Sequence, residues 1–272
     1  GVVMDVVYNH VADAGKFCFN QIVPEYFSRV MDDGSYLSNS GCGNDTASER
    51  SMVSKYIVDS VLYWAEEYHI DGFRFDLVGL IDVDTINELV TEVHKTHPNV
   101  IFYGEGWTMG TNVEPGNTMA TQQNSAETPY FAYFSDTIRN LLAGNNNANE
   151  LGFVSGATGK ESSIIANFLA NPGWSKNPAQ IVQYASCHDN YTLMDKLILS
   201  TGAYGITDDV ISMNNLTATI YMMSQGIPFI HAGEEMLRSK PLPDGGYDHN
   251  SYNNTDAVNS LKWDDLNQAE YQ

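Results

Sequence analysis

Four short segments place carboxylates, histidines, an arginine and aromatic side chains where strand-like apolar runs end. They are Asp5-Val-Val-Tyr-Asn-His10, Gly72-Phe-Arg-Phe-Asp76, Tyr103-Gly-Glu-Gly-Trp107 and Tyr184-Ala-Ser-Cys-His-Asp-Asn190. In a barrel of parallel strands such ends converge on one face, so residues far apart in sequence can surround one substrate. Carboxylates at three of these ends, on Asp76, Glu105 and Asp189, predict glycoside chemistry.

The first two carboxylates have different surroundings in the sequence. Arg74 lies two residues before Asp76, on the same face of a strand, and its charge favours the ionised form that suits a nucleophile. Glu105 is flanked by glycines and Trp107 and faces other carboxylates, so we expect it to hold a proton and act as an acid. Such a pair is typical of a retaining glycosidase, whose carboxyl groups lie about 5 to 5.5 Å apart.

The remaining polar and aromatic groups suit a sugar ligand. We expect Asp189 to accept hydrogen bonds from sugar hydroxyls most strongly as charge develops at the anomeric carbon, with His188 and His10 donating to the same ring. Tyr8 and Trp107 offer flat faces for a pyranose to stack on. One carboxylate at a strand end is more often a helix cap or a solvated charge. Three together with an arginine and two histidines favour an active site.

The elements that would position these residues alternate between strand-like and helical patterns, which predicts an α/β fold with a parallel sheet. Expected strands cover 1–8, 71–77, 100–105, 130–134, 179–186 and 226–231, and expected helices lie near 46–68, 82–97, 161–169 and 209–224. A (β/α)8 TIM barrel needs eight strands. The sequence therefore predicts an incomplete barrel with about the third to eighth strands, the missing two being expected before Gly1.

Two helix starts carry capping signals. Thr46-Ala-Ser-Glu49 has capping-box spacing, and the helix after it carries an apolar stripe that includes Met52, Val53, Ile57, Val61 and Tyr68. For the next helix, Asp82 or Asp84 is the expected cap, and Pro98 is the expected stop.

Composition excludes some classes of function. The 272 residues contain 13 Lys and Arg against 34 Asp and Glu, a net charge of −21 that repels nucleic acid. No apolar run is long enough to predict a membrane span, and neither the three cysteines nor any other motif indicates a metal site or an organic cofactor. The chain starts inside an apolar run with no leader pattern, so we expect its true N-terminus to be missing, and its localisation is left open.

The four segments resemble the four conserved regions of the α-amylase superfamily, glycoside hydrolase family 13, and within it the type I pullulanases. The stretches 40–50, 67–76, 225–235 and 249–253 are similar to the same subfamily. The resemblance implies that Asp76 is the nucleophile, Glu105 the general acid/base and Asp189 the transition-state stabiliser. It also implies that further residues bind the substrate, namely Arg74, His10 and His188 in the −1 sugar subsite, Tyr8 and Trp107 beside it, and Asn253 in a neighbouring subsite.

The residues after Asp76 bear on which bond is cut. Many amylases that cleave α-1,4 bonds carry a Lys-His pair there, whereas this chain has Leu77-Val78-Gly79, as debranching enzymes do. The resemblance thus implies cleavage of α-1,6 bonds in pullulan, limit dextrins and branched starch or glycogen. Asn9 matches a position that binds calcium in many α-amylases, but no partner ligands accompany it, so an amide that pins a loop is the favoured interpretation and no metal ligand is predicted.

Several alternatives stay open. The same three carboxylates would serve an isoamylase-like enzyme, a glycogen-debranching enzyme or a related transglycosylase. Type I pullulanases also have β-rich and carbohydrate-binding domains before the barrel and a β-domain after it, which residues 1–272 lack. The chain is therefore expected to be a partial catalytic barrel, and an alternative of another class is a non-catalytic remnant that binds glucans.

Overall fold

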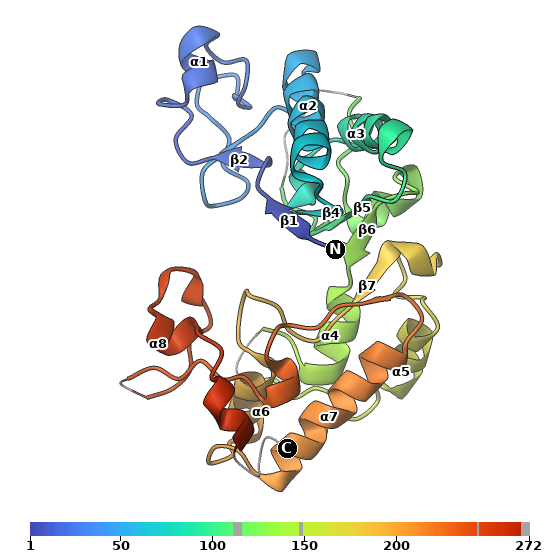
Figure 1. Ribbon diagram of the computed structural model, residues 1–272, viewed down its shortest axis with the longest axis vertical. Coiled ribbons are helices and arrows are strands. Elements are labelled where there is room, and N and C mark those ends of the chain that lie inside the picture. The colour runs from blue at the N-terminus through green and yellow to red at the C-terminus, as the bar shows by residue number, and fades with distance from the viewer. Residues whose placement is uncertain (111–115, 147–148, 244, 268–272) are drawn as a thin grey trace. The chain divides into compact units, whose positions relative to one another are not determined.

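The computed structural model describes residues 1–110, 116–146, 149–243 and 245–267 (Figure 1). The chain divides into two compact units, Gly1–Phe134 and Ser135–Gln272. Each unit combines parallel strands with helices, so the predicted α/β class is confirmed.

Among its described residues, the first unit contains four parallel strands in the order β1-β4-β5-β6, which is also their order along the chain. The strands are β1 (Val3–Val6), β4 (Gly72–Phe75), β5 (Ile101–Gly104) and β6 (Ala132–Phe134). Helices α2 (Ser51–Tyr68) and α3 (Val83–Thr96) pack against each other beside these strands (Figure 1). The long segment after β1 carries α1 (Cys18–Ile22) and a small antiparallel pair, β2 (His10–Val11) and β3 (Asn44–Asp45).

Alternation along β4 separates the core from the opposite face of the sheet. Phe73 and Phe75 are fully buried, and Phe73 stacks on Phe102 of β5, whose ring lies 5.5 Å from His94 of α3. These side chains therefore point toward the helices. Arg74, between them, points the other way because successive strand residues alternate in direction. The core of this unit thus fixes where the arginine must point.

The helix ends in this unit follow the sequence only in part. Asp82 caps α3 by accepting a hydrogen bond from the Thr85 amide at 2.9 Å, and α3 stops at Thr96, before Pro98, as predicted. The predicted capping box is wrong, because α2 begins at Ser51 and Glu49 binds Arg29 at 2.8 Å instead.

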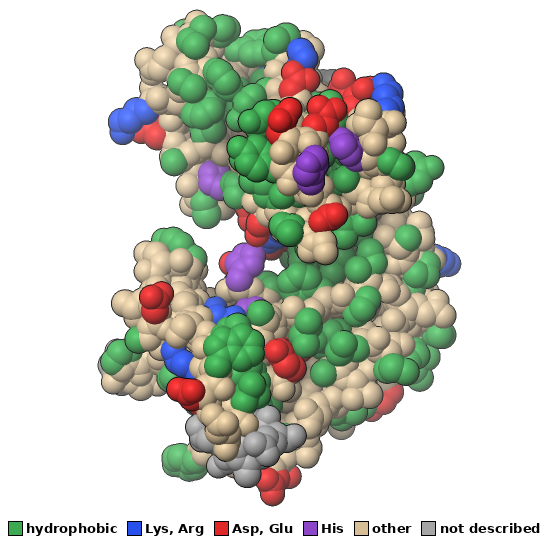
Figure 2. Space-filling model, in the orientation of Figure 1, with side chains coloured by type: hydrophobic (Ala, Val, Ile, Leu, Met, Phe, Trp, Pro, Cys, Tyr) green, Lys and Arg blue, Asp and Glu red, His purple; other side chains and the backbone are tan. Residues whose placement is uncertain are grey.

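The apolar stripe predicted for α2 is narrower than expected. Val53, Ile57 and Val61 are buried, whereas Met52 and Tyr68 are more than half exposed. Figure 2 shows hydrophobic side chains reaching the surface over the region of α1 and α2, where Phe19 and Ile22 join Met52.

The second unit is mainly helical. Strands β7 (Ile181–Gln183) and β8 (Ile227–Pro228) pair in parallel. Its helices are α4 (Asp136–Ala143), α5 (Glu161–Phe168), α6 (Leu193–Thr201), α7 (Asp208–Met223) and α8 (Asp256–Asn259). The sequence predicted α5 and α7 but not α4, α6 or α8, and it predicted β8 longer than the two residues observed. Apolar residues of α4, α6 and α7 form the core of this unit.

Among the described residues, no helix is both long enough and apolar enough to cross a membrane.

Arg29 provides a test of how the first unit is held together. Its side chain is 2% exposed and lies between the Asp45 and Glu49 carboxylates, which are 0% and 1% exposed. Replacing it by methionine leaves two buried carboxylates without their counter-charge, so we expect Arg29→Met to lower the free energy of unfolding by about 3–5 kcal/mol.

The matched control is Lys55→Met, which removes an ion pair with Asp59 whose side chains are 60% and 59% exposed. We expect a change within about 1 kcal/mol for that variant. Urea unfolding measures both, and equal effects of the two variants would contradict the account.

Candidate active site

One guanidinium group, that of Arg74 on β4, binds three carboxylates. Its Nη1 lies 2.8 Å from Asp5 Oδ1 and 3.0 Å from Asp76 Oδ1, and its Nη2 lies 2.8 Å from Glu105 Oε1. Asp5 comes from β1, Asp76 follows β4 and Glu105 follows β5. The structure therefore brings together Arg74, Asp76 and Glu105, as their positions at strand ends predicted.

The charge of Arg74 is strongly favoured. Burial opposes the charged form, but the neighbouring carboxylates of Glu105, Asp5 and Asp76 outweigh this effect and raise the pKa of Arg74 above its ordinary value. The side chain is only 7% exposed, against 23% for Asp76 and 8% for Glu105. Water therefore screens the three charges poorly, and a permanent positive charge lies between the two predicted catalytic carboxylates. The contact of Arg74 with Glu105 favours the ionised form of Glu105, whereas the sequence had led us to expect surroundings that favour the protonated form, so Glu105 must take up a proton against this contact to act as an acid.

Asn9 fixes the other side of Asp76. This fully buried side chain donates from Nδ2 to Asp76 Oδ2 at 2.9 Å and to the Asp76 carbonyl at 2.8 Å. His10 Nδ1 lies 2.6 Å from Asn9 Oδ1, which connects the predicted histidine to the same group. The amide of Asn9 thus pins a loop. Among the described residues, no group of three or more His, Cys, Asp or Glu side chains could hold a metal ion.

A tight turn after Asp76 contacts Glu105 through backbone amides. The Leu77 amide donates to Glu105 Oε2 at 3.2 Å, and the Gly79 amide donates to the Glu105 carbonyl at 3.1 Å. Leu77 adopts a left-handed conformation with φ of 39°, which is unfavourable for leucine. Asn190, directly after Asp189, is also left-handed with φ of 63°. Backbone strain of this kind is concentrated at functional sites in proteins.

The two aromatic residues predicted to stack on sugar lie in different surroundings. The Tyr8 ring lies 5.9 Å from the Phe75 ring, and its hydroxyl is 2.7 Å from Ser60 Oγ on α2. Tyr8 is therefore on the helix side of the sheet, opposite Arg74, and burial raises its pKa. Trp107 is partly exposed and lies two residues beyond Glu105. Their stacking roles remain predictions.

Asp189, His188 and Asn253 all lie in the second unit, so the predicted site residues are divided between the two units. Asp189 and His188 are exposed, and His188 Nε2 lies 3.6 Å from Asp189 Oδ2. Asn253 ends the short turn Ser251–Asn253 and is also exposed.

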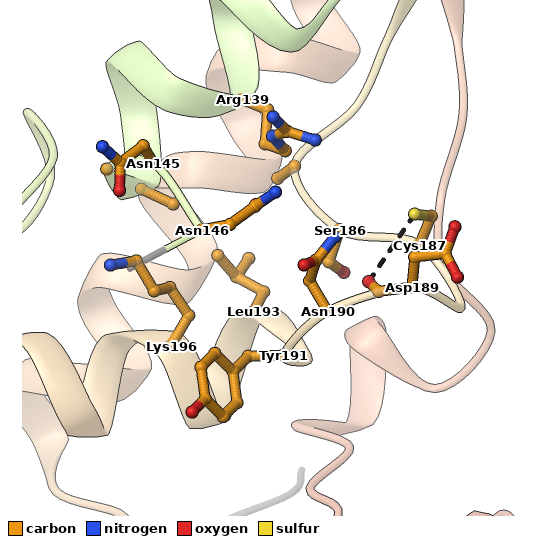
Figure 3. Close-up of a pocket in the computed structure, with 13 residues that line it drawn as sticks. Arg139, Asn145, Asn146, Ser186, Cys187, Asp189, Asn190, Tyr191, Leu193 and Lys196 are labelled. Carbon is orange, nitrogen blue, oxygen red and sulfur yellow. Dashed lines mark hydrogen bonds between the residues drawn. The ribbon is translucent and has the colours of Figure 1, made fainter. Parts of the chain in front are cut away.

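Asp189 borders a small pocket of about 20 Å³ within the second unit (Figure 3). Arg139, Asn146 and Lys196 contribute to its lining. Arg139 Nη1 donates to the Tyr184 hydroxyl at 2.9 Å, and Lys196 Nζ donates to the Glu150 carbonyl at 2.7 Å. A pocket of this size has room for about one water molecule, so it is too small to hold a sugar ring.

The sequence did not predict a role for Asp5 or for the Leu77 amide. The signal for Asp5 is a single acidic residue inside an apolar strand, but its pairing with Arg74 depends on the strand register, in which Asp5 lies opposite Arg74. Nothing in the sequence indicates that Leu77 is left-handed.

Comparison with known proteins gives several similar sequences. The chain is 36% identical over 270 residues to a pullulanase of Bacillus subtilis (strain 168), covering 97% of this chain and 37% of that protein. It is 32% identical to a chloroplastic pullulanase 1 of Arabidopsis thaliana, covering 96% of this chain and 32% of that protein. A glycogen operon protein homologue of Haemophilus influenzae is 29% identical over 71% of this chain and 29% of its own length.

The structure is also similar to solved pullulanases. A crystal structure of the pullulanase from Anoxybacillus sp. LM18-11 complexed with maltotetraose matches with a TM-score of 0.92 and 38% identity, covering 99% of this chain and 38% of that one. No protein-family model matches the chain. The chain spans about a third of the length of these two curated relatives.

A substitution at Gly79 tests whether the turn after Asp76 holds Glu105 in place. A Cβ atom at this position would lie 2.1 Å from the Trp107 carbonyl oxygen, which is backbone and cannot move aside easily. We expect Gly79→Ala to displace the turn and lower the free energy of unfolding by about 1–3 kcal/mol.

Gly110→Ala is the control, because its Cβ would meet only Asn39 Oδ1, at 3.9 Å. Urea unfolding should leave the control close to the parent chain. If the two substitutions have the same effect, the packing of Gly79 on Trp107 does not hold this turn.

Proposed function

We propose, from the chain's membership of the pullulanase family, that the protein carrying this chain hydrolyses α-1,6-glucosidic bonds in pullulan, limit dextrins and branched starch or glycogen. The observation that carries the proposal is the binding of Asp76 and Glu105 by one buried guanidinium. Both carboxylates contact the same guanidinium, which supports the proposal because a double-displacement reaction uses two nearby carboxyl groups.

In this reaction Asp76 attacks the anomeric carbon while Glu105 donates a proton to the departing glycosidic oxygen. The bond between that oxygen and the anomeric carbon breaks, and a glycosyl ester of Asp76 forms. Glu105 then accepts a proton from water, whose oxygen attacks the anomeric carbon and releases Asp76, so the product retains its configuration. Arg74 and Asn9 hold the Asp76 carboxylate for attack through contacts of 3.0 and 2.9 Å.

The remaining predicted residues bind the substrate in this proposal. Asp189 stabilises the charge that develops on the sugar, His10 and His188 donate hydrogen bonds to the same ring, and Asn253 contacts a neighbouring sugar. Trp107 adjoins that ring, whereas Tyr8 lies on the helix side of the sheet, opposite Arg74, and is left out of the proposed subsite. The proposed ligand is an α-glucan oligosaccharide or polysaccharide, and the complex of the Anoxybacillus pullulanase with maltotetraose supports this class of partner. The chemistry uses two carboxyl groups and water, so it needs no organic cofactor.

We also infer that residues 1–272 form about the third to eighth strands of a (β/α)8 barrel, and that the rest of the protein supplies the other strands and the flanking β-domains. The sequential parallel order of β1, β4, β5 and β6 supports this inference. So does the exposure of Val2 and Val3, 60% and 39%, at the start of β1, because an apolar strand of this kind is normally covered by a neighbour.

A close alternative is an isoamylase-like or glycogen-debranching specificity. The similarity to the glycogen operon protein homologue of Haemophilus influenzae supports this alternative. The same carboxylates would serve a pullulanase and an enzyme of this second specificity.

Product analysis on pullulan separates these specificities. The full-length protein is expected to release maltotriose, the product of cutting the α-1,6 bonds of pullulan. Chromatography of the digest measures this directly. Release of panose, or activity on amylose without cleavage of pullulan, would exclude the proposed specificity.

The two catalytic carboxylates can be tested in the same protein. We expect Asp76→Asn and Glu105→Gln each to lower turnover of pullulan by about a thousand-fold or more, with substrate binding still measurable for Glu105→Gln. Asp59→Asn, on the exposed surface of α2, is the matched control and should leave turnover unchanged. Unchanged turnover in either active-site variant would rule out the role proposed for that residue.

A further inference from the structure

The second unit contains a lysine that is buried close to its exposed predicted site residues. Lys240 is 3% exposed, although lysine is rarely buried unless its charge is paired. Its Nζ donates to Ser251 Oγ at 2.6 Å and lies 3.5 Å from the His188 carbonyl oxygen, a long contact. The ammonium group therefore lies between the loop that carries His188 and Asp189 and the turn that carries Asn253.

The backbone of Lys240 is anchored independently of its side chain. Its amide donates to Asp195 Oδ2 at 2.8 Å, and the Ser239 hydroxyl donates to the other oxygen of the same carboxylate. Asp195 is fully buried in the first turn of α6. Lys240 thus starts from a fixed point on the core of the unit and reaches out to two surface segments.

Each of the two surface segments contacts Lys240 through an atom that lies close to the exposed residue of that segment. Ser251, which is 3% exposed, begins the turn Ser251–Asn253, and its carbonyl also accepts a hydrogen bond from Asn259 Nδ2 at 2.7 Å. The His188 carbonyl belongs to the peptide bond that leads directly into Asp189. The exposed groups of Asp189 and Asn253 are therefore each within two residues of an atom that Lys240 contacts.

A charge at this place is costly to keep. Burial lowers the pKa of Lys240, and the positive charge of Arg238 lowers it further, while Asp248, Asp195 and Cys187 act in the opposite direction. The hydrogen bonds to Ser251 Oγ and to the His188 carbonyl therefore hold the ammonium group at this place.

We propose that Lys240 is a positioning residue for the substrate, which fixes the His188–Asp189 loop relative to the turn that carries Asn253. The inference rests on the proposed function, because it concerns residues assigned there to sugar binding. Lys240 itself is not expected to touch the substrate, since its amino group is buried beneath both segments.

The test compares pullulan hydrolysis by variants of the full-length protein. We expect Lys240→Met, which keeps the length of the side chain but removes its charge, to lower kcat/KM about 10- to 100-fold, because small displacements of binding groups have effects of this size. Ser251→Ala removes the same 2.6 Å hydrogen bond without burying a new group, and it should lower kcat/KM in the same direction. Lys176→Met, at an exposed lysine of the same unit, is the control and should match the parent.

The same substitution made in an Asp189→Asn protein separates an effect on positioning from a general effect on stability. If Lys240 acts through Asp189, Lys240→Met should lower kcat/KM much less in an Asp189→Asn protein than in the parent, because the two effects share one path. An unchanged kcat/KM for Lys240→Met and Ser251→Ala in an active parent would overturn the positioning role, as would equal losses in both backgrounds. A full-length parent that does not hydrolyse pullulan would instead overturn the proposed function, and this inference with it.

Discussion

The site in the first unit depends on the interaction of one buried guanidinium with three carboxylates. Arg74 contacts Asp5, Asp76 and Glu105 at 2.8 to 3.0 Å, and its own charge is favoured by these neighbours despite its burial. Like charges on three nearby carboxylates would repel one another without it. The arginine therefore makes it possible for residues from three strand ends to share one small volume, and everything proposed about catalysis requires that arrangement.

The helices of this unit matter mainly because they fix that arginine. Phe73 and Phe75 of β4 are buried beneath α2 and α3, so only one face of this strand can point toward the core. Arg74, which lies between them, must face away from the core. The backbone then adds finer constraints. Asn9 holds Asp76 from one side, while the left-handed Leu77 directs its amide at Glu105. In the second unit, Lys240 has a comparable role. Its backbone amide is held by the buried Asp195 carboxylate, and its side chain donates to Ser251, which begins an exposed turn.

The sequence predicted much of this arrangement, and its failures have physical causes. The convergence of Arg74, Asp76 and Glu105 followed from alternation along strands, and the end of α3 followed from Pro98. The role of Asp5 depended on register, which no local pattern determines. The capping box at Thr46 failed because the Glu49 side chain is used by the buried Arg29, a tertiary contact stronger than a local preference. Helix α6 was not predicted, although Thr192 caps it, because its residues are buried on most sides and show little periodicity.

The central claim is that Asp76, held by Arg74 and Asn9, is the nucleophile of a retaining reaction. The most direct measurement is to trap the glycosyl-enzyme intermediate of the full-length protein with a fluorinated, activated α-glucosyl donor and to locate the label by peptide mass mapping. We expect one sugar attached to the Asp76 carboxyl group. A label on another residue, or products with inverted anomeric configuration, would contradict it.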